Sequence, residues 1–182
     1  LVELRKWLAG HARDRIELPV ADDQQRLDQS LAMYLLVRDL MKELKAVGGG
    51  FMSQLEWGSD KRGLPLPVAD IMESLFNSTF DHTGKKPVIP FATEADVQGL
   101  LTMLFMTCLS AGNPPLFMDF RKVWEAWELQ ALAKKLKIKL TGKTVWERRG
   151  LVDGDNSGSA SFDWAAKPGT SIKEIMQRIS FP

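Results

Sequence analysis

Two carboxylates in this chain come after short apolar segments, where they could bind a divalent cation. Glu94 follows the segment Pro87–Ala92, and Asp119 follows Leu116–Met118. Both segments are bounded by turn residues, so we predict that they are buried strands. Ligands of open parallel sheets bind beyond the carboxyl ends of the strands, and consecutive parallel strands bring these ends to one edge. We therefore expect Glu94 and Asp119 to face the same crevice.

The chemistry of such a pair is the binding of a hard cation. We expect a helix to open at Thr93, as its N-cap, so that Glu94 lies in the first turn, where the helix dipole stabilises an ionised carboxylate. Two carboxylates without cysteine or histidine beside them suit Mn²⁺ or Mg²⁺ better than Zn²⁺. Gln54 ends a third apolar run and is a candidate for the same edge. The alternative at this point is that each acidic residue is only a cap or an exposed turn residue.

The elements that must position these side chains alternate between helices and short strands. Apolar residues at helical spacing predict helices over 22–46, 68–76, 93–112 and 126–136. Gly48-Gly49-Gly50 is predicted to end the first of them. The strand 87–92, the helix after it and the strand 116–118 predict two parallel strands joined by a right-handed crossover.

The second half of the chain has a looser pattern. Beyond Arg121 we expect short extended pieces at 138–140 and 145–152 and a polar turn over 153–161. The predicted fold class is therefore α/β, with an open, mostly parallel sheet flanked by helices and an irregular, partly β C-terminal portion. A composition shift near 112–120 is the candidate domain boundary.

Length and composition limit the classes of function. The chain has 182 residues, with 24 Lys and Arg against 23 Asp and Glu, and this balance makes no case for nucleic acid or a membrane surface as partner. No apolar run reaches the roughly 18 residues of a membrane span. A single cysteine, Cys108, fits a reducing compartment, and we expect it to be a core thiol. The chain begins at Leu1 rather than Met, so we expect a fragment of a longer protein.

Three further motifs are weaker. Asp153–Gly158 imitates the start of a calcium loop, but the position that needs a bidentate glutamate is Trp164. Gly142-Lys143-Thr144 lacks the glycine that a phosphate loop needs five residues earlier. The basic run from Lys134 to Lys143 predicts a solvated face or a subunit contact, because no aromatic platform for nucleic acid accompanies it.

Four motifs, taken in order, resemble the L-fucose isomerase family, which includes D-arabinose isomerases. They are Asn77-Ser78-Thr79-Phe80-Asp81, Ala92-Thr93-Glu94, Phe117-Met118-Asp119-Phe120-Arg121 with Trp124, and Asn156-Ser157-Gly158-Ser159-Ala160. The resemblance is to the second, α/β domain of that family running into the start of its C-terminal domain. It implies a division of this chain into an α/β domain over 1–112 and the incomplete beginning of a C-terminal domain over 113–182.

The resemblance also implies an activity, aldose–ketose isomerisation through a cis-enediol. By it, Glu94 and Asp119 would ligate Mn²⁺ (or another divalent cation such as Mg²⁺) and shuttle the substrate proton, while Gln54 and Ser157 would contact the sugar. It further implies a small-molecule sugar as substrate, a cytoplasmic location and a homo-oligomer, a hexamer in the family. The third metal ligand of the family, a histidine near its C-terminus, has no match here, because His11 and His82 lie upstream.

Other functions remain as alternatives. One is a noncatalytic relative that binds sugar, and another is an inactive fragment whose site needs missing domains. A doubly wound nucleotide-binding domain would need a glycine-rich loop directly after a strand, whereas Gly48-Gly49-Gly50 precedes one.

Overall fold

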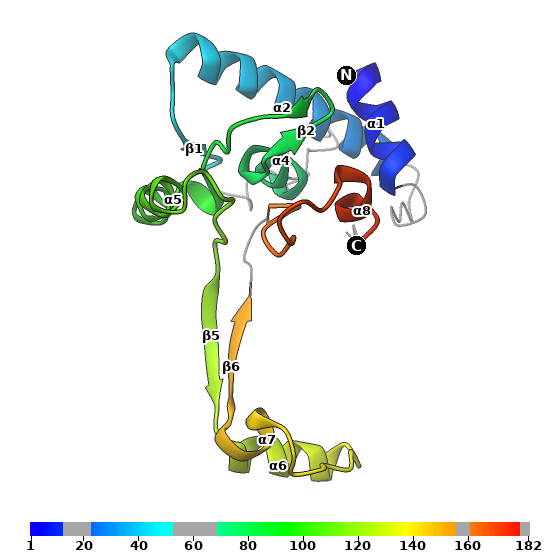
Figure 1. Cartoon of the computed structure of the whole chain (residues 1–182), viewed down its shortest axis with the longest axis vertical. Coiled ribbons are helices and arrows are strands. Elements are labelled where there is room, and N and C mark those ends of the chain that lie inside the picture. The colour runs from blue at the N-terminus through cyan, green and yellow to red at the C-terminus, as the bar shows by residue number, and fades with distance from the viewer. Residues whose placement is uncertain (13–22, 53–68, 156–160, 179–182) are drawn as a thin grey trace, which may run out of the picture. The chain divides into compact units, whose positions relative to one another are not determined.

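The computed structural model describes residues 1–12, 23–52, 69–155 and 161–178 (Figure 1). The described helices are α1 (Val2–Ala12), α2 (Asp23–Leu44), α4 (Ala69–Asn77), α5 (Val97–Leu109), α6 (Ala126–Lys135), α7 (Val145–Arg149) and α8 (Ile172–Met176), with a 3-10 turn, η3 (Thr93–Ala95). The described strands are β1 (Gly49–Gly50), β2 (Phe80–Asp81), β3 (Gly84–Lys85), β4 (Phe91–Ala92), β5 (Asp119–Trp124) and β6 (Leu151–Asp155).

The chain forms two compact units. The first comprises Leu1–Phe117 together with Gly158–Pro182, and the second comprises Met118–Ser157. The chain therefore leaves the first unit after Phe117 and returns to it at Gly158. The predicted domain division between residues 112 and 113 stays a prediction.

Strand pairing confirms the α/β class and shows where the parallel pairing lies. Strands β1 and β4 are parallel, with Gly49 opposite Phe91 and Gly50 opposite Ala92. The pairs β2–β3 and β5–β6 are antiparallel. The helices predicted over 22–46, 68–76 and 126–136 are confirmed as α2, α4 and α6.

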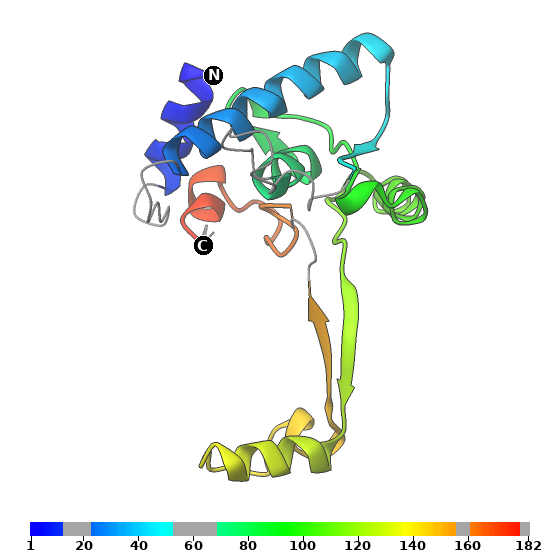
Figure 2. The same cartoon turned by 180° about the vertical axis from the view of Figure 1, so that it is seen from behind.

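The core of the first unit is a row of aromatic rings. Phe76 on α4 stacks on Phe91 of β4, with ring centroids 4.5 Å apart and planes 12° apart. Tyr34 of α2 lies 4.8 Å from Phe76, and Phe51, directly after β1, lies 4.7 Å from Phe91. Figure 2 shows α2 running over α4, with which it is in contact. Burial of these rings joins the parallel strand pair to the two helices.

The second unit is an antiparallel ribbon with two helices at one end (Figure 1). In β5 and β6, Phe120 is opposite Gly154 and Trp124 is opposite Leu151, with a bulge between Phe120 and Lys122. The predicted strand at 116–118 is wrong, because extended pairing begins only at Asp119 and its partner is β6. Pro114 and Pro115 lack the backbone N–H groups that a paired strand donates.

The extended pieces predicted at 138–140 and 145–152 are also partly wrong. Residues 138–140 form no strand, residues 145–149 form α7, and only the part from Leu151 is extended. Glu147 explains the helix: its carboxylate accepts hydrogen bonds from the N–H and the hydroxyl of Thr144 at 2.9 and 2.8 Å. This capping box was present in the sequence as Thr144-Val145-Trp146-Glu147.

Helix α5 has a different exposure from the one expected. Cys108 is exposed rather than a core thiol, because the buried face of α5 carries Met103 and Thr107 instead.

In the part of the chain that the structure describes, no helix is both long enough and apolar enough to cross a membrane.

Candidate functional site

Glu94 lies on a sharp turn directly after β4, not in the first turn of a helix. Its backbone has φ 55° and ψ 23°, and that of Ala95 has φ 52°, so both residues are in the left-handed region. Helix α5 therefore begins at Val97. Its N-cap is Asp96, whose carboxylate accepts hydrogen bonds from the N–H groups of Gln98 and Gly99 at 3.0 Å each. The prediction that Thr93 is the N-cap is wrong, because the left-handed pair interrupts the helix.

The turn exposes the carboxylate that the sequence analysis selected. The Glu94 side chain is exposed and makes no hydrogen bond or ion pair with the residues that the structure describes. A non-glycine residue in the left-handed region carries a conformational cost of about 1–3 kcal/mol, which the surrounding structure must offset. The contacts around the turn, described next, offset this conformational cost.

Asn77, the last residue of α4, holds β4 from the side opposite β1. Its Nδ2 donates to the carbonyl oxygen of Phe91 at 2.9 Å, and its Oδ1 accepts from the N–H of Phe91 at 2.8 Å. On the other side, the N–H of Gly49 donates to the carbonyl oxygen of Pro90 at 3.0 Å. The two-residue strand is thus bonded on both edges, and it fixes the start of the Glu94 turn.

Thr93 anchors the turn to α4. Its hydroxyl donates to Glu73 Oε2 at 2.8 Å, and both side chains are buried. A hydrogen bond to a carboxylate inside the protein is worth about 1.5–3 kcal/mol, which is comparable with the cost of the turn that follows.

The glycine run after α2 brings β1 close to this turn. A Cβ at Gly50 would lie 2.7 Å from the carbonyl oxygen of Ala92 and 2.8 Å from Cα of Ala95, so only glycine fits. The prediction that the run ends the helix is wrong: α2 ends at Leu44, and Lys45, with φ 54°, takes the left-handed cap position. Gly49 and Gly50 instead form the strand that supports β4 and the Glu94 turn.

The motif Asn77-Ser78-Thr79-Phe80-Asp81 joins segments that are distant in the sequence. Ser78 Oγ accepts from the N–H of Phe162 at 2.7 Å. The N–H of Thr79 lies 3.4 Å from each carboxylate oxygen of Asp163, and the Thr79 hydroxyl also donates to that carboxylate. The motif therefore ties α4 to β4 and to the segment before α8, a role that its sequence alone did not indicate.

Asp81 completes the junction by binding α2. Its carboxylate accepts from the Tyr34 hydroxyl at 2.8 Å and from the N–H and hydroxyl of Thr83 at 2.7 and 2.6 Å. Burial acts to raise the pKa of Asp81, but the hydrogen bonds from Thr83 and Tyr34 outweigh it and hold the pKa below the ordinary value of 3.8. Asp81 is therefore a buried, ionised structural residue.

The structure does not place the other predicted site residues relative to Glu94. Gln54 and Ser157 lie outside the described residues. Asp119 is the first residue of β5, with its backbone opposite Asp155, and it belongs to the second unit, whereas Glu94 belongs to the first. That Glu94 and Asp119 share a crevice stays a prediction. Within the described ranges there is no group of three or more His, Cys, Asp or Glu side chains that could hold a metal ion.

Comparison with known proteins addresses the resemblance directly. A family model described as "L-fucose isomerase, second N-terminal domain" matches residues 10–111. The L-fucose isomerase of Clostridium perfringens is 34% identical over 121 residues, covering 66% of this chain and 18% of that protein. The L-fucose isomerase of Streptococcus pneumoniae serotype 4 is 28% identical over 184 residues, covering 92% of this chain and 29% of that protein.

This chain thus spans between 18% and 31% of the length of the curated relatives that it matches. The matched region includes the aromatic row, the Asn77–Asp81 junction and the Glu94 turn. The resemblance drawn from the four motifs is confirmed, and the chain belongs to the L-fucose isomerase family, with residues 10–111 corresponding to its second N-terminal domain.

Proposed function

We propose that this chain is part of a metal-dependent aldose–ketose isomerase of the L-fucose isomerase type, which acts on a free aldose through a cis-enediol. The observation that carries the proposal is the family match over residues 10–111, which takes in Ala92-Thr93-Glu94. The exposed Glu94 carboxylate on its rigid turn supports it, since a group that reacts with a sugar must be accessible and held still.

Glu94 and Asp119 are the proposed acid–base residues. Aldose–ketose conversion moves a proton between C2 and C1 of the sugar, and a carboxylate within hydrogen-bond reach can remove it from one carbon and return it to the other. Gln54 and Ser157 are the proposed contacts to the sugar hydroxyls. A divalent cation bound at this site would polarise the substrate carbonyl and stabilise the negative charge that develops on oxygen.

The residues present fit a hard divalent cation in kind but supply only part of a coordination sphere. Glu94 offers an accessible carboxylate without a competing ion pair among the described residues, and carboxylate oxygens are preferred ligands of Mn²⁺ and Mg²⁺. We propose that Asp119 adds a second carboxylate and that the remaining ligands come from polypeptide beyond these 182 residues. A cytoplasmic homo-oligomer, a hexamer as the resemblance implies, belongs to the same proposal.

An isomerisation assay tests the proposal. L-fucose and D-arabinose are offered, with Mn²⁺ and with EDTA, to the 182-residue chain and to the complete gene product in which it occurs. We expect ketose formation by the complete product, abolished by EDTA, and a loss in kcat of about 10²–10⁴-fold in Glu94→Gln, since the variant cannot accept a proton. Glu43→Gln, which changes an exposed carboxylate on α2, is the matched control and should keep the parent's rate.

The outcomes separate the alternatives. Turnover by the complete product but not by the 182-residue chain means that the site needs segments absent here. Saturable sugar binding without any turnover favours the noncatalytic relative. Undiminished turnover in Glu94→Gln contradicts the assignment of Glu94.

A further inference from the structure

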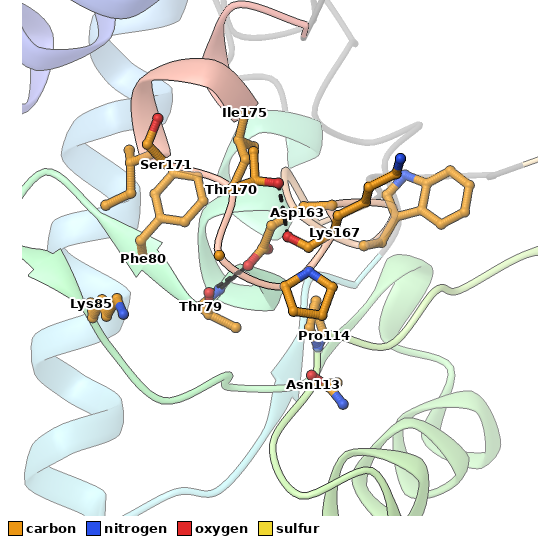
Figure 3. Close-up of a pocket in the computed structure, with 15 residues that line it drawn as sticks. Thr79, Phe80, Lys85, Asn113, Pro114, Asp163, Lys167, Thr170, Ser171 and Ile175 are labelled. Atoms are coloured by element: carbon orange, nitrogen blue, oxygen red, sulfur yellow. Dashed lines mark hydrogen bonds between the residues drawn. The ribbon is translucent and has the colours of Figure 1, made fainter.

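The first unit has an open pocket away from the Glu94 turn. Its volume is about 720 Å³, which is within the range of about 300–1,000 Å³ that is usual for small-molecule sites. Three segments line it: the β2–β3 hairpin with Thr79, Phe80 and Lys85, the residues Asn113 and Pro114, and the chain from Asp163 to Ile175 (Figure 3). None of the four predicted site residues is among the lining residues.

Asp163 brings a buried negative charge to the pocket wall. Its side chain is 9% exposed, and among the described residues its carboxylate accepts hydrogen bonds from Thr79 alone, the bonds drawn in Figure 3. With respect to these residues, lone pairs of the carboxylate remain available. It has no ion-pair partner among residues 1–12, 23–52, 69–155 and 161–178. A ligand that donates hydrogen bonds can use this carboxylate.

The pocket lining also carries hydrogen-bond donors and acceptors. The side chains of Lys85 and Lys167 are exposed and have no hydrogen bond or ion pair with the described residues. The Asn113 amide uses one N–H on the carbonyl oxygen of Ser110 and keeps the other. The hydroxyls of Thr170 and Ser171 donate to Lys167 O and Glu174 Oε2, at 2.8 and 2.7 Å, so they offer acceptor lone pairs to a ligand.

Apolar surface completes the lining. Phe80 and Ile175 are buried, and Trp164 has 51% of its surface exposed. The lining thus combines an exposed indole, which has a flat apolar face, with a carboxylate and amine donors as polar partners.

The charges favour a neutral ligand. The buried Asp163 carboxylate would repel an anion, and the ammonium groups of Lys85 and Lys167 would repel a cation. A ring that carries several hydroxyl groups can donate to Asp163, accept from the lysines and Asn113, and pack its C–H face on Trp164. We propose that this pocket, whose lining contains neither Glu94 nor Asp119, is an accessory site for a neutral pyranoside. This proposal is independent of the isomerase proposal.

The test uses methyl α-L-fucopyranoside with the 182-residue chain in EDTA. This glycoside has no free carbonyl, so it cannot be isomerised, and binding to it is independent of whether the chain is an isomerase. We expect saturable shifts of the Trp164 indole N–H in ¹H–¹⁵N spectra, with a Kd in the millimolar range. The indole signal is assigned by its disappearance in Trp164→Ala.

Two pocket variants and one control decide the outcome. Trp164→Ala and Asn113→Ala both change exposed side chains, and each should weaken glycoside binding by about fivefold or more. Binding to these variants is measured from the backbone NMR shifts of Thr79 and Ile175. Trp127→Ala removes an indole of the second unit that is 65% exposed, and it should bind like the parent. The proposal is overturned by the absence of saturable shifts, by equal affinity in Trp164→Ala, or by saturation with inorganic phosphate or tetramethylammonium in place of the glycoside.

Discussion

The side chain of Asn77 makes both backbone hydrogen bonds of Phe91, with its Nδ2 on the carbonyl oxygen at 2.9 Å and its Oδ1 on the N–H at 2.8 Å. A neighbouring strand would make the same pair of bonds. Because β1 occupies the other edge of β4, this single side chain takes the role of a third strand. The turn that carries Glu94 begins two residues later, so this amide helps to fix its position, together with β1 and the hydrogen bond between Thr93 and Glu73.

Asn77→Ala should therefore destabilise the protein. The change leaves the buried N–H and carbonyl of Phe91 without their partner, and the expected loss is about 2–4 kcal/mol in the free energy of unfolding. Urea denaturation followed by circular dichroism measures it. Gln98→Ala removes an exposed amide that makes no side-chain hydrogen bond with the described residues, and it should change the free energy by less than about 0.5 kcal/mol. A loss at Asn77 no larger than in this control would contradict the role of the amide.

Gly50→Ala should displace the Glu94 turn. The added methyl group would lie within 2.8 Å of backbone atoms of Ala92 and Ala95, which cannot move without disturbing β4. We expect a loss of about 1–3 kcal/mol in unfolding free energy and backbone NMR shifts at residues 92–96.

The matched control is Gly10→Ala, where nothing lies within 4 Å of the new Cβ. Gly10 is within α1, so alanine there should stabilise the protein by about 0.5–1 kcal/mol. Equal effects of the two substitutions would show that the approach of β1 to the turn is not restrictive.

Tyr34→Phe should weaken the protein at neutral pH more than in acid. The hydroxyl that it removes donates to the ionised Asp81 carboxylate at 2.8 Å, inside the core, and its loss should cost about 1.5–3 kcal/mol. Because the pKa of Asp81 in the folded state lies below its ordinary 3.8, this stabilisation is present above about pH 4 and is lost as the pH falls below it. Unfolding of parent and variant between pH 7 and pH 2 measures this. A constant difference across that range would contradict the ionised state of Asp81.

Lys86 should make stability rise in alkaline solution. Its Nζ donates to the carbonyl oxygens of Phe76 and Ser78 at 2.9 and 2.6 Å, and burial lowers its pKa from 10.5 to about 8, against the attraction of Asp81 and Asp163. Between about pH 8 and 10.5 the unfolded chain binds more protons than the folded chain, so the contribution of this group to stability increases with pH, by up to about 3 kcal/mol.

Comparison with Lys86→Met isolates this contribution. The free energy of unfolding of the parent relative to the variant should increase from pH 7.5 to pH 10.5. Lys85→Met changes the exposed neighbouring side chain and should retain the parent's increase. A difference between parent and Lys86→Met that does not change with pH would show that the ammonium group is not penalised by burial.

The helices could be predicted from the sequence, and the strand partners could not. Helix α2 was expected over 22–46 and runs from Asp23 to Leu44, because a helix is stabilised by bonds and side-chain spacing within its own segment. A strand is stabilised by hydrogen bonds to another strand, and the local sequence does not show which segment that partner is. In the run Gly48-Gly49-Gly50, which has the composition of a helix end, Gly49 and Gly50 pair with β4, whereas the apolar segment 116–118 forms no strand.

For the candidate site, too, the sequence predicted some features and the tertiary structure decided others. Its residue types and motifs were sufficient to recognise the family and to select Glu94. The left-handed turn that exposes Glu94, and the junction made by Asn77–Asp81, were decided only by the tertiary structure. They rest on contacts such as Ser78 with Phe162 and Tyr34 with Asp81, which join segments far apart in the chain and leave no periodic signal within either segment.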